Sequence, residues 1–231
     1  MVNAMVTPTS GTVFVRGRDV AGENPVHLRR SIGYVLQEGG LFPHRTVADN
    51  VATVPRLEGT PAREARERAR ELLDLVGLEP DLARRYPAQL SGGQRQRVGV
   101  ARALANRADI LLMDEPFGAL DPLVRADLQR ELKEIQAALG ATILFVTHDV
   151  DEAFTLGDQV AVLSRGGRIE QVGAPSDLLS SPASEFVADF VGASRAARPV
   201  RLAGSGSLLV DEEGTPVGTL TPGSGGEGTA S

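Results

Sequence analysis

The chain has 231 residues, of which 42% are hydrophobic and 23% are charged, so it holds enough apolar residues for a sizeable buried core. Its net charge of −6 argues against nucleic-acid binding, because such proteins need cationic surfaces for the phosphates. The absence of cysteine excludes disulfides, thiolate metal sites and a cysteine nucleophile. No apolar run approaches the roughly 20 residues that span a bilayer.

The first half of the chain shows the residue patterns of short strands and helices. In chain order, these patterns predict the end of a helix at Met1–Val6, strands at Thr12–Arg16 and Ile32–Leu36, and helices at Val26–Arg30, Val47–Val54 and Pro61–Val76. The last helix has the clearest pattern, because its apolar residues fall on one face: Ala65, Ala69, Leu72, Leu73 and Val76.

The second half alternates strands with helices more regularly. We expect strands at Ile110–Met113, Thr142–Val146, Gln159–Ser164 and Arg168–Val172, and helices at Gly93–Ala105, Pro122–Leu139, Asp151–Leu156, Pro175–Leu179 and Ala183–Phe190. In the helix over 122–139, the inward residues are expected to be Leu128, Leu132, Ile135 and Leu139. Continuous apolar strands between helices predict an α/β fold with a largely parallel sheet. Gly223–Ser231 is expected to be disordered.

The segment Leu90-Ser-Gly-Gly-Gln94 stands where a helix begins. Gly92 and Gly93 let the backbone approach a ligand closely. The free N–H groups of a helix N-terminus favour an anion such as a γ-phosphate, and Ser91 can add a hydroxyl donor. The same residues also suit an ordinary Ser cap followed by a Gly-rich turn. By itself, the segment leaves both interpretations open.

Two acids follow the apolar strand at Ile110–Met113. Ligands of α/β proteins bind at the carboxyl edge of the parallel sheet, which is where these acids would lie. Asp114 is suited to hold Mg²⁺ there, and Glu115 is suited to polarise an attacking water. An acidic N-cap region for the next helix is the weaker interpretation, because two adjacent carboxylates repel each other.

Three further polar residues are candidates, and two of them follow predicted strands. His148 follows the strand at Thr142–Val146, although a lone histidine is more often structural than catalytic. Gln37 ends the strand at Ile32–Leu36, and its amide could reach a metal or a water. Asp121 precedes Pro122, which also fits an ordinary helix N-cap.

Taken together and in order, these segments resemble the ATP-binding subunits of ABC transporters. The matching segments are similar to that family's Q-loop, signature, Walker B with catalytic glutamate, D-loop and switch histidine: Gln37, Leu90–Gln94, Ile110–Glu115, Ala119–Asp121 and His148. The resemblance covers about Met1 to Val191. It implies catalytic roles for Glu115 and His148, Mg²⁺ contacts for Asp114 and Gln37, and ATP contacts for Gln37, Ser91, Gly92, Gly93, Gln94 and Asp121.

The resemblance implies a P-loop NTPase (RecA-like) core with a helical insert. The implied division places the N-terminal part of the ATPase core at 1–44, the helical subdomain at 45–90, the rest of the core at 91–192 and a tail at 193–231. Within the tail, Ser207–Leu220 looks like one strand–turn–strand piece of a CBS module, or a plain hairpin.

One family motif is missing. The phosphate-binding loop G-x-x-x-x-G-K-[ST] occurs nowhere in the 231 residues, and the one lysine, Lys133, has no glycine among the residues directly before it. The resemblance aligns Met1–Val6 just after that loop, so we expect the strand that carries it to be missing, through either a mis-set start or a real truncation. The loop supplies most triphosphate binding. We therefore expect the chain alone to hydrolyse ATP barely above background, and its unpaired sheet to lower its stability.

A narrower resemblance points to importers of quaternary amines. It is carried by five segments: Gly39–His44, Asn50–Pro55, Arg85–Pro87, Gln94–Ala103 and Phe186–Gly192. The implied function is ATP hydrolysis that drives import of glycine betaine, choline, carnitine or proline-type osmoprotectants. The alternatives are an inactive ABC module, an importer ATPase for methionine or a polyamine, and a non-transport ABC ATPase.

The resemblance also implies partners and a location. The expected cofactors are ATP and Mg²⁺, and the expected partners are a second ATPase subunit in a homodimer, membrane permease subunits and, indirectly, a substrate-binding protein. No nucleic acid is expected, and the location is the cytoplasmic face of the membrane. The apolar residues Leu41, Phe42 and Pro43 suit either a permease-docking patch or a small satellite core.

Overall fold

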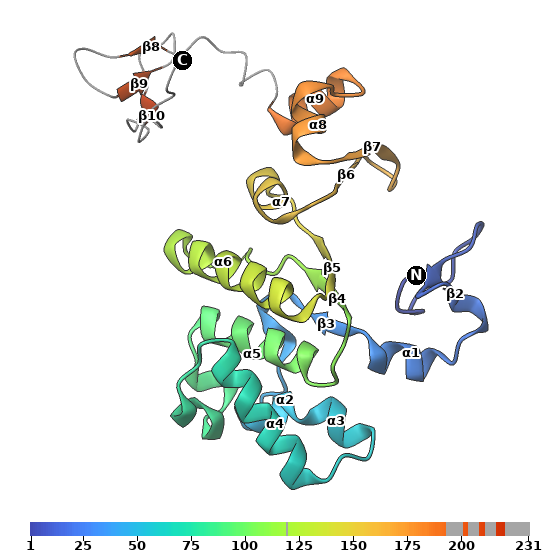
Figure 1. Cartoon of the computed structure of the whole chain (residues 1–231), viewed down its shortest axis with the longest axis vertical. Helices are drawn as coiled ribbons and strands as arrows, with labels where there is room; N and C mark the ends of the chain where they lie inside the picture. The colour runs from blue at the N-terminus through green and yellow to red at the C-terminus, as the bar shows by residue number, and fades with distance from the viewer. Residues whose placement is uncertain (119, 193–200, 203–207, 211–215, 220–231) are drawn as a thin grey trace, which may run out of the picture. The chain divides into compact units, whose positions relative to one another are not determined.

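The computed structural model describes residues 1–118, 120–192, 201–202, 208–210 and 216–219. The chain divides into two units, Met1–Asp149 and Val150–Ser231, which are described separately below. Figure 1 shows the elements along the chain. The finer division into four parts stays a prediction.

The first unit contains a three-stranded parallel sheet in the order β3–β4–β5. These strands are β3 (Gly33–Val35), β4 (Ile110–Asp114) and β5 (Thr142–Val146). Gly33 lies opposite Leu111, and Ile110 lies opposite Thr142, so the strands end together at one edge of the sheet. The predicted α/β fold with a parallel sheet is confirmed. Strand β4 is central, and Leu111, Leu112 and Met113 are buried.

In the described residues of this unit, six α-helices accompany the sheet: α1 (Pro25–Ser31), α2 (Val47–Val51), α3 (Thr53–Leu57), α4 (Ala62–Leu75), α5 (Gly92–Leu104) and α6 (Pro122–Leu139). Helix α5 lies between α4 and α6 and packs on β3 (Figure 1). The predicted apolar face of α4 is confirmed, because all five of its residues are buried. The prediction for Leu139 on α6 is wrong: it is 47% exposed, since Gly140 ends the helix with a left-handed backbone immediately after it.

Short 3₁₀ turns connect these helices and strands. They are η1 (Val20–Gly22), η2 (Gln37–Gly40), η3 (Pro80–Arg84) and η4 (Pro87–Gln89). At the N-terminus, β1 (Phe14–Val15) lies inside the strand predicted at Thr12–Arg16, and it pairs with a second short strand, β2 (Arg18–Asp19), in an antiparallel hairpin. The predicted helix end at Met1–Val6 is wrong, because these residues form turns and bends. The Asn3 side chain accepts a hydrogen bond from the Met5 N–H, which competes with helix formation.

The second unit begins with α7 (Val150–Leu156) and an antiparallel hairpin of β6 (Val160–Leu163) and β7 (Ile169–Gly173). The predicted hairpin is confirmed, as are the two helices that follow, α8 (Pro175–Ser180) and α9 (Glu185–Val191). Their buried residues form one small core: Val162, Leu178, Val187 and Val191.

The described strands near the C-terminus form a second antiparallel sheet. It consists of β8 (Arg201–Leu202), β9 (Leu208–Val210) and β10 (Pro216–Thr219). The pairing of β9 with β10 agrees with the strand–turn–strand prediction for Ser207–Leu220. The prediction of disorder for Gly223–Ser231 lies outside the described residues. Within the described parts of the chain, no helix combines the length and apolar character needed to cross a membrane.

Candidate functional site

Ser91 is the N-cap of α5 and forms a reciprocal capping box with Gln94. The Ser91 hydroxyl accepts a hydrogen bond from the Gln94 N–H at 3.2 Å, and the Gln94 side chain accepts one from the Ser91 N–H at 2.9 Å. The helix-cap interpretation therefore applies to both side chains. A ligand here would meet the remaining N–H groups of the first turn and the positive end of the helix dipole.

The two glycines after Ser91 differ in what packing requires. A Cβ on Gly93 would lie 2.7 Å from Cγ1 of Val124, so Gly93 is needed where α5 meets α6. A Cβ on Gly92 would meet nothing closer than 3.8 Å, an ordinary contact. Packing thus does not explain Gly92, and its open backbone suits the close approach of a ligand.

Glu115 and His148 come together at the carboxyl edge of the sheet, although 33 positions separate them. His148 Nδ1 lies 3.1 Å from Glu115 Oε1. The backbone of Glu115 donates to the Val146 carbonyl at 2.9 Å, which places it beside the end of β5. The His148 side chain is 74% exposed and that of Glu115 33% exposed, so both can reach a ligand from solvent.

The backbone at Glu115 is strained. Its φ is +42°, a left-handed conformation that is unfavourable for a residue with a side chain. A Cβ on Gly118 would lie 3.3 Å from Glu115 Oε2, so the glycine leaves room for the Glu115 carboxylate. Strained residues held by their surroundings concentrate at functional sites, so the conformation of Glu115 supports a chemical role.

The other predicted site residues differ in their surroundings. The Asp121 carboxylate accepts a hydrogen bond from the Val124 N–H at 3.1 Å, which is the ordinary N-cap interpretation. Gln37 begins the turn η2, and the structure describes its backbone but not its side chain. The predicted contact between Gln37 and a metal therefore stays a prediction. Asp114 is exposed at the end of β4.

Asp114 fits a Mg²⁺ ion, because its exposed carboxylate is a hard oxygen ligand at the ligand-binding edge of the sheet. The described residues contain no group of three or more His, Asp or Glu side chains suited to enclose a metal. Mg²⁺ rarely needs such an enclosure, since it commonly binds one or two carboxylates together with substrate phosphates and water. The residues present therefore suit a Mg²⁺–nucleotide better than a free metal ion.

One connection near this edge joins residues that no sequence motif singles out. Arg125 donates to the Asp149 carboxylate at 3.1 Å and to the Leu120 carbonyl at 3.4 Å. It thus links the loop before α6 with the residue after His148. No motif indicated this pair, since arginine is common along the whole chain.

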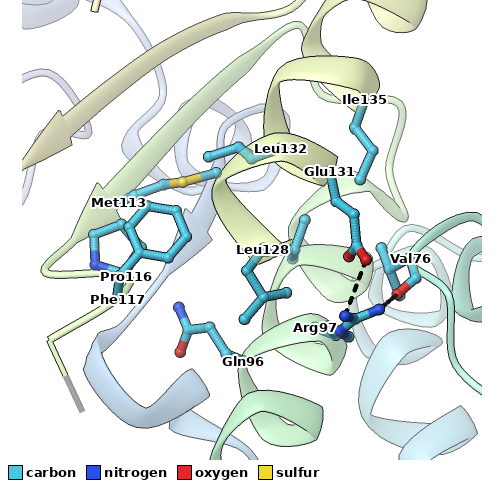
Figure 2. Close-up of a pocket in the computed structure, with 11 residues that line it drawn as sticks. Val76, Gln96, Arg97, Met113, Pro116, Phe117, Leu128, Glu131, Leu132 and Ile135 are labelled. Atoms are coloured by element: carbon cyan, nitrogen blue, oxygen red, sulfur yellow. Dashed lines mark hydrogen bonds and ion pairs between the residues drawn. The ribbon is translucent and has the colours of Figure 1, made fainter. Parts of the chain in front are cut away.

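A separate small pocket lies between α5 and α6 (Figure 2). Its lining is mostly apolar and includes Met113, Phe117 and Leu128. Its volume of about 20 Å³ holds about one water, so it is not a nucleotide site. The Gln96 amide lines it and is 4% exposed, and its nitrogen has no hydrogen-bond partner in the described structure.

Comparison with known proteins gives a consistent result. A family model described as ABC transporter matches residues 1–118. The chain is 51% identical over 195 residues to the glycine betaine/carnitine/choline transport ATP-binding protein OpuCA of Bacillus subtilis, covering 84% of this chain and 51% of that protein. It is 50% identical over 194 residues to the spermidine/putrescine import ATP-binding protein PotA of Thermobifida fusca, covering 84% of this chain and 50% of that protein.

Solved structures agree with this similarity. One is a dimeric post-hydrolysis state of the ATP-binding cassette MJ0796 bound to ADP and Pi, with 34% identity and a TM-score of 0.66. The match covers 75% of this chain and 77% of that one. The chain spans about half the length of the two curated relatives above.

Proposed function

We propose that this chain, which belongs to the ABC transporter family, supplies ATP-hydrolysing parts of an importer for quaternary amines such as glycine betaine, carnitine and choline. The observation that carries the ATPase proposal is the 3.1 Å contact between Glu115 and His148 at the carboxyl edge of the sheet. The similarity to OpuCA supports the solute class.

Glu115 is the proposed general base. In this role its carboxylate, which stands directly after β4, accepts a proton from the water that attacks the γ-phosphate. With a proton on Nδ1, His148 donates to that carboxylate, which orients the ring toward the site. In its protonated form, His148 also offers an Nε2–H to the charge that develops on the phosphate.

The remaining predicted residues bind and orient ATP. The first turn of α5 (Ser91 to Gln94) is the proposed contact for the γ-phosphate of a nucleotide held by a second copy of the chain, because its N–H groups and dipole favour an anion. Asp114 and Gln37 are the proposed Mg²⁺ ligands. When bound, Mg²⁺ neutralises phosphate charge in the transition state. Asp121, which caps α6 by accepting a hydrogen bond from the Val124 N–H, is a further proposed ATP contact.

We propose permease subunits at the cytoplasmic face of a membrane as the direct partners, with a substrate-binding protein as an indirect partner. Phe42 and Pro43 are exposed, which favours the docking-patch interpretation over a satellite core. The centroid of the Phe42 ring lies 6.0 Å from that of the His44 ring. The Arg45 guanidinium lies over the Phe42 ring, 5.0 Å from its centroid. An exposed aromatic group of this kind suits a protein contact.

Two chimeras test the proposal. In each, this chain replaces the aligned residues of one relative, OpuCA or PotA, which supplies the rest of its own length. We expect the OpuCA chimera to restore glycine betaine uptake with its own permease. The PotA chimera is expected to give little spermidine uptake, because the docking residues would suit the first permease.

Glu115→Gln in the OpuCA chimera should lower ATP turnover about 100-fold or more while ATP still binds. Glu134→Gln, an exposed glutamate on α6, is the matched control and should leave turnover unchanged. Normal turnover in the Glu115→Gln variant would show that the base is assigned wrongly. Spermidine uptake without betaine uptake would overturn the solute class and leave the ATPase proposal intact.

A further inference from the structure

Arg102 on α5 makes contacts that the proposed reaction does not use. Its guanidinium donates to the Gly40 carbonyl at 2.7 Å and to the Gly39 carbonyl at 2.8 Å. These two carbonyls belong to η2, the turn that Gln37 begins. Burial lowers the pKa of Arg102 from its ordinary value, because the surroundings remove part of the water around this charge. The two terminal nitrogens of one planar guanidinium thus bind two adjacent carbonyls, which fixes the backbone of that turn against α5.

The turn also lies directly against the α5 backbone. A Cβ on Gly99 would lie 3.1 Å from the Cα of Gly39, and a Cβ on Gly39 would lie 2.6 Å from the carbonyl oxygen of Arg95. Gly39 has φ +78°, a conformation that glycine adopts readily. Arg95, Gly99 and Arg102 follow one another at helical spacings of four and three residues. They therefore form one stripe of α5 that contacts the turn.

The same helix begins at Ser91. Arg102 lies 11 positions later, roughly 16 Å along a helix axis. A helix of this length is stiff, so a turn fixed to its second half keeps a constant distance from its first turn. The segment that starts with Gln37 and the capped start of α5 are thus held as one body.

We propose that Arg102 is a positioning residue that holds Gln37 at a fixed place relative to the first turn of α5. The functional meaning of this placement rests on the proposed ATP site, where both segments contact the nucleotide or its metal. The placement itself does not depend on ATP. Lysine cannot replace Arg102 fully, because one ammonium group lacks the planar fork that reaches two adjacent carbonyls.

A distance measurement on the whole chain tests this role. The chain has no cysteine, so Glu38→Cys in the turn and Asp74→Cys on α4 create the only two sites for spin labels. Asp74 is exposed, and α4 packs on α5, so this pair reports the position of the turn relative to the helix. Double electron–electron resonance without nucleotide should give one narrow distance distribution.

Arg102→Met should broaden that distribution about twofold or more, because the turn loses the two hydrogen bonds that hold it. Arg102→Lys should give an intermediate width. Gly99→Ala should shift the mean distance, since its new Cβ meets Gly39. Arg130→Met, which removes an exposed arginine of α6 from its ion pair with Asp127, should change neither value.

A destabilised control separates positioning from general stability. Leu132→Ala removes a buried side chain of α6 and should lower Tm at least as much as Arg102→Met does, yet leave the distribution narrow. An unchanged width in Arg102→Met, or equal broadening in Leu132→Ala, would overturn the proposal. Because the measurement uses no ATP, failure of the chimeras to hydrolyse ATP would count against the proposed function and not against this positioning role.

Discussion

Two regions of the first unit differ in how far their apolar side chains are buried. One is the helical region formed by α2, α4 and α5, and the other is the strand β5. In the helical region, Val47, Val51, Ala69 and Val98 are completely buried. In β5, Leu144 is 53% exposed and Val146 is 62% exposed, although both are strongly apolar. β5 pairs with β4 along one side only within the described sheet.

The polar groups of the two regions differ in the same way. Asn50 is completely buried in the helical region, where its side chain accepts from the Phe42 N–H and donates to three backbone carbonyls, those of Phe42, Arg45 and Thr46. An edge strand, by contrast, leaves backbone groups open on its unpaired side. Substitutions should therefore cost much in the helical region and little in β5.

Leu72→Ala should have the largest effect on stability. Leu72 is almost completely buried on α4, and removing such a side chain leaves a cavity among packed helices. We expect the free energy of unfolding to fall by about 2–5 kcal/mol, measured by urea titration. The neighbouring exposed position Leu75→Ala is the control, and an equal loss there would contradict the idea of a closely packed helical core.

Asn50→Leu should come next. The substitution keeps a similar size but leaves the Phe42 N–H and several carbonyls without their side-chain partner. We expect a loss of about 2–3 kcal/mol in unfolding free energy, since each buried group left unsatisfied costs roughly 1–3 kcal/mol. A change below about 0.5 kcal/mol would mean that water replaces the amide, and the helical region would then be less closed than Asn50 indicates.

A pH dependence of stability should arise at Asp49. The Arg66 guanidinium, 2.9 Å away, holds the pKa of this carboxyl below its usual range, and Thr46 lowers it further. A folded pKa below the unfolded value of about 3.9 gives stability that is present above pH 4 and is lost as pH falls through the folded pKa.

Arg66→Met should remove that contribution. We expect the two proteins to differ by about 0.5 kcal/mol at pH 6, because the pair is partly solvent-exposed, and to converge near pH 2. Urea titrations at several pH values measure the difference. A gap between the two proteins that grows below pH 4 would contradict the assignment of Arg66 as the partner.

Leu144→Thr in β5 should have the smallest effect on stability. Threonine suits a strand, and the leucine is already half exposed, so we expect a change within about 0.5 kcal/mol. Aggregation, measured by light scattering on warming, should decrease because the edge becomes more polar. The matched change Leu112→Thr in β4 should cost several times more, since Leu112 is buried. Equal losses of unfolding free energy in the two variants would show that the Leu144 side chain is buried in solution.

Much of the fold was predictable because periodicity is local. The strand at Thr142–Val146 and the helix at Pro122–Leu139 have the predicted bounds. The predicted burial of Leu139 is wrong, because apolar spacing does not show whether another element covers the last turn of a helix. The predicted helix end at Met1–Val6 is wrong, because the Asn3 side chain binds the nearby backbone instead. In the site, chain order predicted that Glu115 and His148 would share one edge, but not that they would touch.

The residue types and their order by themselves determined the α/β alternation, the parallel sheet and the edge at which Asp114, Glu115 and His148 collect. Strand ends and helix caps are short-range features, so the chain states them directly. Only the tertiary structure decided that Arg102 donates hydrogen bonds to the Gly39 and Gly40 carbonyls, because these bonds join residues about 60 positions apart. The tertiary structure also decided that Leu144 is exposed and Leu112 is buried. Burial depends on which elements pack against a strand, and an apolar sequence pattern does not contain that information.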